Sequence, residues 1–290
     1  MNPKNRRYIL NTSNYNTQID KIKKYLIQGE TYQINFTQPK YYKLFNEPFN
    51  TYRIMRESIK PHYGAYMNIN NFSILSFSPE RFFKTKQNKI KTYPMKGTRP
   101  RSNNDLIDKQ LANELLNSQK DKAEHLMIVD LLRNDIGKIC EYNSININNL
   151  YSVHSFETVH QMITQINGKL KHNIKEIEII KALFPGGSIT GAPKEESMRI
   201  IDNLEKYQRS IYTGSLGYIL KNGDMDFNIA IRTMTTTNNK AVYPVGGGII
   251  WDSNPLNEWK EAQQKSKILS PYVLKKNIKN NKIKTVSLTN

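Results

Sequence analysis

The sequence predicts an α+β fold, and three observations lead to this expectation. Segments with helical spacing and segments with strand-like alternation follow one another in mixed order, without a regular βαβ repeat. Neighbouring extended segments form hairpin-like pairs such as YILKNGDMDF. The 290 residues contain no internal repeat and no low-complexity linker. A chain of this length buries about 75 % of its unfolded surface, so one large domain or two small ones would fit.

The first half of the chain alternates between the two kinds of element. We expect a helix over Ile19–Gln28 and, after Gly29, a strand in TYQINFTQ. Ser118 with Asp121 resembles a capping box, and Asn104 is of a residue type that caps helices. The other elements expected here are a helix at Tyr52–Ile59, extended segments near Tyr63–Asn68, Phe72–Phe77 and Arg81–Lys86, a helix over Asp105–Asn117, and a helix from Ser118 to near Gly137.

In the second half, two prolines indicate where helices begin. Pro193 and Pro255 occupy plausible first helical positions, where the missing proline N–H has no partner to lose. Period-two alternation in MDFNIAIRTM predicts a single continuous strand. The elements expected in this half are helices over Lys194–Tyr207 and Leu256–Lys267 and strands over Thr213–Leu220, Met225–Thr233 and Ala241–Ile250.

Composition argues against several classes of protein. Apolar residues make up 38 % of the chain in short runs, so we expect no membrane-spanning helix and no membrane partner. The net charge of +18 suggests nucleic acid, but the basic residues are scattered and lack an aromatic ladder or zinc pattern, so no nucleic-acid partner is expected. Cys140 alone cannot form an internal disulfide. Because no apolar h-region follows the N-terminus, we expect a cytoplasmic protein.

Charged side chains cluster on two of the predicted helices. Glu258, Glu261 and Lys265 are spaced i, i+3 and i+7, so all three project from one face. Asp121 and Glu124 form a second acidic pair at i, i+3. Carboxylates of the two helices could together hold Mg²⁺, which prefers oxygen ligands. The same spacing also fits a solvated face on which the lysine relieves carboxylate repulsion.

Two glycine-rich segments favour ligand binding through the backbone. FPGGSITGAPK places Thr190 just ahead of a helix, where free N–H groups and the helix dipole suit a carboxylate or phosphate, although an ordinary tight connection fits equally well. In PVGGGII, Gly246, Gly247 and Gly248 interrupt a strand, which costs stability unless a backbone or ligand comes close. Arg232 nearby has the fork geometry for a bidentate carboxylate pair.

Eight segments follow one another in a characteristic order: GETYQINFTQ, SPERF, PMKGTRPR, AEHLMIVDLLRNDIGKIC, FPGGSITGAPK, YTGSLGY, IRT and GGGIIWDSNPLNEWKEAQQKS. Together they resemble the chorismate-utilising enzymes, which include component I of aminodeoxychorismate synthase and of anthranilate synthase, and isochorismate and salicylate synthases. The resemblance runs from about Tyr15 to Pro271. It implies a chorismate-binding catalytic domain at 15–271, between a short extension at 1–14 and a basic tail at 272–290. Family members carry a longer segment ahead of this domain, so the N-terminal part of the family fold is expected to be missing.

The resemblance also implies roles for single residues. Mg²⁺ would be bound by Glu124 and Glu261, with Glu258 beside them. The carboxylates of the substrate would be received by Tyr212, Arg232, Lys265 and the backbone of Gly246, Gly247 and Gly248, with Thr190 as a further substrate-binding candidate.

Two positions distinguish the branches of the family. Members that add water to chorismate carry a lysine base where this chain has Gln33, and a neutral amide cannot deprotonate water. Anthranilate synthases resemble PIAGT, whereas aminodeoxychorismate synthases resemble PIKGT. This chain reads PMKGT, with Lys96 at the position that differs.

The chemistry of the aminodeoxychorismate branch gives this lysine a purpose. We expect Lys96 to add at C2 of chorismate as the C4 hydroxyl leaves, and ammonia then to enter at C4 as the lysine departs. Glu80 in SPERF would be the general acid for the hydroxyl. A neutral Lys96 requires a lowered pKa, to which Arg99 and Arg101 would contribute. The alternatives are a surface lysine at a turn and a Glu80 that pairs with Arg81.

The source of nitrogen and one family feature need separate comment. Cys140 lacks the glycines of a glutaminase elbow, so ammonia would come from solution or from a separate glutamine amidotransferase subunit, component II. Gln161 stands where several family members have a histidine, with His160 beside it. Anthranilate synthase component I and an inactive chorismate-family subunit are the rival interpretations.

Overall fold

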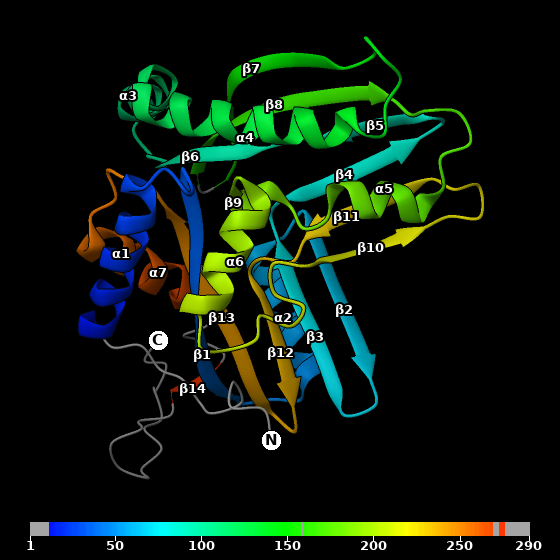
Figure 1. Ribbon diagram of the computed structural model, residues 1–290. Helices are drawn as coiled ribbons and strands as arrows, with labels where there is room; N and C mark the ends of the chain where they lie inside the picture. Colours follow the sequence, from blue (N-terminus) through cyan, green and yellow to red (C-terminus); the bar gives the residue numbers. More distant parts are fainter. Residues whose placement is uncertain (1–11, 158, 269–272, 276–290) are drawn as a thin grey trace. The chain divides into compact units, whose positions relative to one another are not determined.

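The computed structural model describes residues 12–157, 159–268 and 273–275. These residues form two compact units. The first unit contains the described residues up to Pro79, then Ile189–Leu216, and those from Ala230 onward. The second contains the described residues of Glu80–Ser188 together with Gly217–Ile229. The mixture of helices and antiparallel sheets confirms the α+β class (Figure 1).

An antiparallel sheet forms the centre of the first unit. Its strands run in the order β14-β1-β13-β12-β3-β2, and β9 also pairs with β1. Thr37 of β1 faces Gly246 of β13 and Phe36 faces Gly247, so the glycine strand lies directly against β1. The strands are β1 (Gln33–Leu44), β2 (Tyr63–Ile69), β3 (Phe72–Ser78), β9 (Gly191–Ala192), β12 (Thr233–Thr237), β13 (Lys240–Ile249) and β14 (Val273–Lys275).

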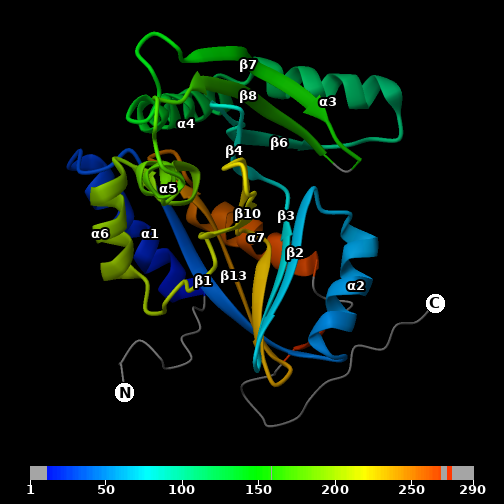
Figure 2. The same ribbon diagram turned by 90° about the vertical axis from the view of Figure 1, so that its right-hand side faces the viewer.

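Four helices pack against this sheet: α1 (Thr12–Ile27), α2 (Pro48–Ile59), α6 (Lys194–Leu204) and α7 (Pro255–Ser266). Helix α2 lies along β2 and β3 (Figure 2), and Met55 is fully buried there with Leu75 and Phe77. Helices α1 and α6 share a second apolar cluster with β1, in which Ile19 and Ile200 are fully buried. These clusters fix the positions of β13 and α7, which carry the glycine and carboxylate candidates.

The second unit has its own antiparallel sheet. The order is β10-β11-β4-β5-β8-β6, with β7 on the other edge of β8. Helices α3 and α4 contact the part formed by β6 and β8 (Figure 1). The elements are β4 (Arg81–Lys86), β5 (Lys89–Thr92), β6 (Met95–Pro100), α3 (Asp105–Asn117), α4 (Gln119–Gly137), β7 (Asn146–Ser155), β8 (Val159–Lys169), α5 (Glu176–Leu183), the 3-10 turn Gly187–Ile189, β10 (Ser215–Ile219) and β11 (Met225–Ile229).

Several helix limits agree with the capping arguments. Asn104 accepts hydrogen bonds from the N–H groups of Leu106 and Ile107, and Ser118 accepts one from Asp121, so both predicted caps are confirmed. Pro255 opens α7 as expected. Helix α6 ends at Leu204, earlier than predicted, because Glu205 takes an extended backbone.

One predicted strand is wrong. Residues 225–233 do not form a continuous strand, because β11 ends at Ile229 and β12 begins at Thr233. Between them Arg232 adopts φ 48°, a left-handed conformation that strand geometry does not allow. The chain also changes partner there, since β11 pairs with β4 and β12 pairs with β3. The alternation in MDFNIAIRTM therefore does not place Arg232 on a strand face.

Among the described helices, none is both long enough and apolar enough to cross a membrane.

Candidate active site

The candidate residues are distributed over both units. The second unit contains Glu80, Lys96 and Glu124. The first unit contains the other candidates, which are Thr190, Tyr212, Arg232, Gly246, Gly247, Gly248, Glu258, Glu261 and Lys265.

Lys96 lies on β6, within the sheet rather than on a turn. It is opposite Met162 of β8, and Thr98 is opposite Gln161, so Gly97 is an extra residue in the ladder. Gly97 has φ 67°, and a Cβ there would lie 2.7 Å from Leu115 and 3.0 Å from Asp121. Only glycine fits this bulge, and bulges change the direction in which neighbouring side chains point. The bulge at Gly97 therefore influences the direction of the half-buried Lys96 side chain.

Glu80 is a buried carboxyl group that holds a proton near neutral pH. Its residue is 9 % exposed, and Ser188 Oγ donates a hydrogen bond to its Oε1 at 3.1 Å. Burial raises the pKa of Glu80 to about 7, against the opposing effects of the Ser188 hydrogen bond and the positive charge of Lys96. Lys96 and Glu80 belong to the same unit, and the positive charge of Lys96 favours the ionised form of Glu80. Arg81, its expected alternative partner, makes a two-point pair with Asp226.

His125 is a further residue on which the charge of Lys96 acts. The sequence argument assigned it no role. It is fully buried on α4, and its Nε2 lies 2.7 Å from Thr164 Oγ1. Burial, and then the positive charge of Lys96, lower the pKa of His125 to about 4, so the imidazole is neutral. Glu124 precedes it, half-buried, with its carboxylate 4.0 Å from the amine of Lys120. The sequence signal that could have pointed to His125 is its position on the apolar face of a predicted helix.

The two arginines expected to lower the pKa of Lys96 are each paired with a carboxylate. Arg99 lies 2.9 Å from Asp121, and Arg101 lies 2.8 Å from Asp108. Paired in this way, their charges are largely offset, so the environment of Lys96 depends less on them than the sequence suggested.

The histidine beside Gln161 has a structural partner set. His160 is 1 % exposed, its Nε2 lies 2.9 Å from Asp108 Oδ1, and its Nδ1 lies 2.9 Å from Ser155 Oγ. These contacts tie the end of the β7–β8 hairpin to α3.

In the first unit, the α7 side chains converge on Gly247. A Cβ on Gly247 would lie 3.5 Å from Glu258 Oε2, 3.7 Å from Glu261 Oε1 and 3.7 Å from Lys265 Nζ. Lys265 also pairs with Glu261 at 2.7 Å and donates to the carbonyl of Gly246 at 2.9 Å. Ser253 donates to Glu258 Oε1 at 2.7 Å. The predicted common face is confirmed, and it lies over the glycine strand.

The residues on α7 suit Mg²⁺. No group of three His, Cys, Asp or Glu side chains with metal-binding spacing occurs within the described ranges. Mg²⁺ nevertheless commonly uses only one or two protein carboxylates and completes its shell with waters and substrate oxygens. Glu258 and Glu261 present two carboxylates over a residue that has no side chain. Tyr15 Oη is buried without a hydrogen-bond partner, and burial, then Glu258 and Glu261, raise its pKa, which keeps it a neutral donor near the pair.

The remaining candidates of the first unit are Tyr212, Thr190 and Arg232, which lie outside its helices and strands. Tyr212 is 7 % exposed, and burial raises the pKa of its phenol, so it is a neutral hydrogen-bond donor. Thr190 is buried, and its carbonyl accepts a hydrogen bond from Asn35 N. Arg232 is exposed, and its left-handed backbone is held by a bond from Phe77 N to its carbonyl.

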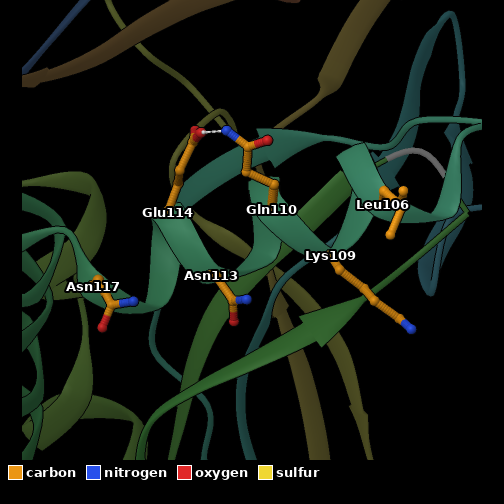
Figure 3. A pocket seen from close by; sticks show the side chains of 6 residues that line it. All are labelled: Leu106, Lys109, Gln110, Asn113, Glu114 and Asn117. Carbon is orange, nitrogen blue, oxygen red and sulfur yellow. Dashed lines mark hydrogen bonds between the residues drawn. The ribbon is translucent and has the colours of Figure 1, made fainter.

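A surface hollow lies elsewhere, on the exposed face of α3 (Figure 3). It is lined by Leu106, Lys109, Gln110, Asn113, Glu114 and Asn117. None of these is a candidate residue, and Gln110 hydrogen-bonds Glu114 along the helix at 3.1 Å.

The fold and the order of the motifs are those of one protein family. A family model described as chorismate binding enzyme matches residues 1–271, so the chain belongs to this family. It is 37 % identical over 252 residues to aminodeoxychorismate synthase component 1 of Bacillus subtilis, covering 87 % of this chain and 54 % of the relative. For the Salmonella typhimurium protein of the same name the identity is 38 % over 258 residues, covering 89 % of this chain and 57 % of the relative.

A solved structure shows the same fold. Anthranilate synthase component I of Streptococcus pneumoniae superposes with a TM-score of 0.82 at 32 % identity, covering 89 % of this chain and 57 % of that one. The chain thus spans just over half the length of the relatives it matches.

Proposed function

We propose that this chain aminates chorismate at C4 to give 4-amino-4-deoxychorismate, as aminodeoxychorismate synthase component I. The observation that carries the proposal is that a buried acid, Glu80, and a half-buried lysine, Lys96, belong to the same unit and interact electrostatically. A buried carboxyl with a pKa near 7 is acted on by the charge of a half-buried lysine in the same unit. A nucleophilic amine beside a protonated acid is what this reaction requires.

The steps balance with these two groups. The neutral amine of Lys96 forms a bond to C2, the two conjugated double bonds of the ring shift, and the C4 hydroxyl leaves as water with the proton of Glu80. Ammonia then bonds to C4, both double bonds shift back, and the lysine departs from C2 with its electron pair returned to nitrogen. The proton released by ammonia restores Glu80, so the net change exchanges hydroxyl for amine.

The other candidates bind and orient. The backbone of Gly246–Gly248, Tyr212, Arg232 and Lys265 would receive the carboxylates of chorismate. Glu258 and Glu261 would hold Mg²⁺, which when bound supplies positive charge for a substrate carboxylate. The assignment of Glu124 to the metal rests on the family resemblance alone. Ser188 keeps Glu80 in place through its hydrogen bond. A separate glutamine amidotransferase would supply the ammonia, and folate synthesis would use the product.

The proposal is tested by product analysis with chorismate, Mg²⁺ and ammonium. We expect 4-amino-4-deoxychorismate, which an added lyase converts to 4-aminobenzoate. Lys96→Ala should reduce product to background and abolish trapping of a C2 adduct, because no amine remains to attack. Lys91→Ala changes an exposed lysine on β5 of the same sheet, so it is the matched control and should leave the rate unchanged.

Two results would contradict the proposal. Fluorescent anthranilate formed without a lyase would assign the chain to anthranilate synthase, the function named for the similar Streptococcus pneumoniae structure. Chorismate binding without any turnover, with ammonium or with an amidotransferase present, would indicate an inactive subunit.

A further inference from the structure

Arg209 is a buried arginine that the proposed chemistry does not use. Its Nε and Nη2 donate to the two carboxylate oxygens of Glu205 at 2.8 and 2.7 Å. The side chains of Arg209 and Glu205 are only 14 % and 2 % exposed. A buried ion pair is weak evidence for stability, because both charges lose water, so its other contacts have to explain its presence.

The same guanidinium also reaches two segments that are distant from it in the sequence, and one that follows it closely. Nη2 donates to the carbonyl of Asn35 on β1 at 2.6 Å, and Nη1 donates to the carbonyl of Ile189 at 2.9 Å. Nη1 also lies 3.4 Å from Thr213 Oγ1. Arginine suits this task because its planar fork carries five N–H donors, whereas lysine has three on a single nitrogen.

Two of these contacts are next to candidate substrate groups, and a third link is indirect. Ile189 precedes Thr190, and Thr213 follows Tyr212. The third link runs through Glu205, whose Oε1 accepts from the N–H and the hydroxyl of Thr37, both at 2.8 Å. Thr37 is the register partner of Gly246.

The backbone beside Tyr212 also carries strain. Thr213 has φ 63°, which is unusual for a β-branched residue, and it persists only where the surroundings hold it. Its N–H donates to the carbonyl of Ala230, and its hydroxyl donates to the carbonyl of Tyr212. These two hydrogen bonds hold the strained residue directly after Tyr212.

We propose that Arg209 is a positioning residue that holds Thr190, Tyr212 and the Gly246 backbone in one arrangement before the substrate arrives. The inference depends on the proposed function only in taking chorismate as the ligand. Preorganised groups bind without the entropy cost of ordering, so loosening them weakens binding.

The test compares Arg209→Lys with a control of similar stability loss. Lysine keeps the positive charge beside Glu205, so no buried charge is left unpaired. Met55→Ala removes a fully buried side chain of α2, a helix that contacts β2 and β3, and should lower thermal stability without removing any contact of Arg209. In equilibrium titrations with chorismate and Mg²⁺, we expect Arg209→Lys to raise Kd at least tenfold and Met55→Ala to leave it unchanged.

A ligand-independent readout separates this inference from the proposed function. Hydrogen exchange of the free protein should show faster exchange around residues 189–192, 212–214 and 246–248 in Arg209→Lys, and not in Met55→Ala. Unchanged exchange and unchanged Kd in Arg209→Lys would overturn the positioning role. If wild type fails to bind chorismate, the proposed function fails, and the exchange result still decides the role of Arg209.

A second variant covers the case in which Arg209→Lys does not fold. Thr37→Val keeps the shape of the residue and removes the hydroxyl that contacts Glu205 and Tyr207. We expect faster exchange at 246–248 and a several-fold rise in Kd. Wild-type values for both would contradict the link from Arg209 to Gly246.

Discussion

Glu80 shows how one residue couples stability to chemistry. The carboxyl is largely buried, and burial raises its pKa to about 7 because ionisation in this place is costly. Burial raises the pKa of Glu80, which makes the group a useful acid. The same burial lowers the stability of the folded state when the carboxyl ionises.

The pH dependence of the free energy of unfolding should reveal the raised pKa of Glu80. The folded pKa is about 7 and the reference value is 4.5, so the folded state binds more protons between these values. The contribution is fully present below about pH 4.5 and is lost as pH rises through 7, by about 3 kcal/mol in total. Urea unfolding at pH 4.5 and pH 8 should show this loss in wild type relative to Glu80→Gln. A difference between the two proteins that does not change with pH would contradict the raised pKa.

At the scale of elements, the contact of α7 with β13 determines what the glycines do. Gly246 and Gly247 are neighbours on one strand, but their surroundings differ. A Cβ on Gly246 would lie 2.1 Å from the carbonyl of Phe36, whereas one on Gly247 would make ordinary contacts with the α7 carboxylates and lysine. The first glycine is required by strand packing, and the second keeps space open under the carboxylates.

This contrast predicts opposite effects for two adjacent substitutions. Gly246→Ala should lower the free energy of unfolding by about 3 kcal/mol or more, because backbone must move to admit the methyl group. Gly247→Ala should cost under about 1 kcal/mol but weaken Mg²⁺ binding measured by calorimetry, since the methyl fills the space that the carboxylates face. A Gly247→Ala protein that binds Mg²⁺ as wild type does would place the metal elsewhere.

At the scale of the whole molecule, the chain passes between its two units four times, and one of these crossings lies between Pro79 and Glu80. Glu80 and Ser188 are the first and last residues of the long segment of the second unit, so their hydrogen bond joins its two ends. Glu80, a catalytic candidate, thus lies where the chain enters this unit. Its position depends on the hydrogen bond that joins the two ends of the segment.

The net charge of +18 is also a property of the whole molecule. We expect any binding to duplex DNA to be independent of sequence and to fall at least about tenfold between roughly 50 and 200 mM salt, because it arises from counterion release. Fluorescence anisotropy with two unrelated duplexes tests this. Selective binding of one duplex that persists at the higher salt would indicate a nucleic-acid function that the scattered lysines do not suggest.

The sequence by itself determined the α+β class, the limits of α3, α4 and α7 to within one residue, and the chemical types of the candidate residues. Caps such as Asn104 and Ser118 and the common face of Glu258 and Glu261 depend on residues a few positions apart, so local spacing was enough. The order of motifs was enough to indicate the family, and the PMKGT segment indicated its branch.

Only the tertiary structure decided the environments of these groups. The break in the strand at Arg232, the neutral His125 beside Thr164, and the contacts of Arg209 with Asn35 and Ile189 all depend on pairings between distant segments. Burial and hydrogen bonding across such distances set a pKa or fix a backbone, and they leave no local periodicity in the chain. The candidate residues were therefore proposed from sequence, whereas the physical environment of each one required the fold.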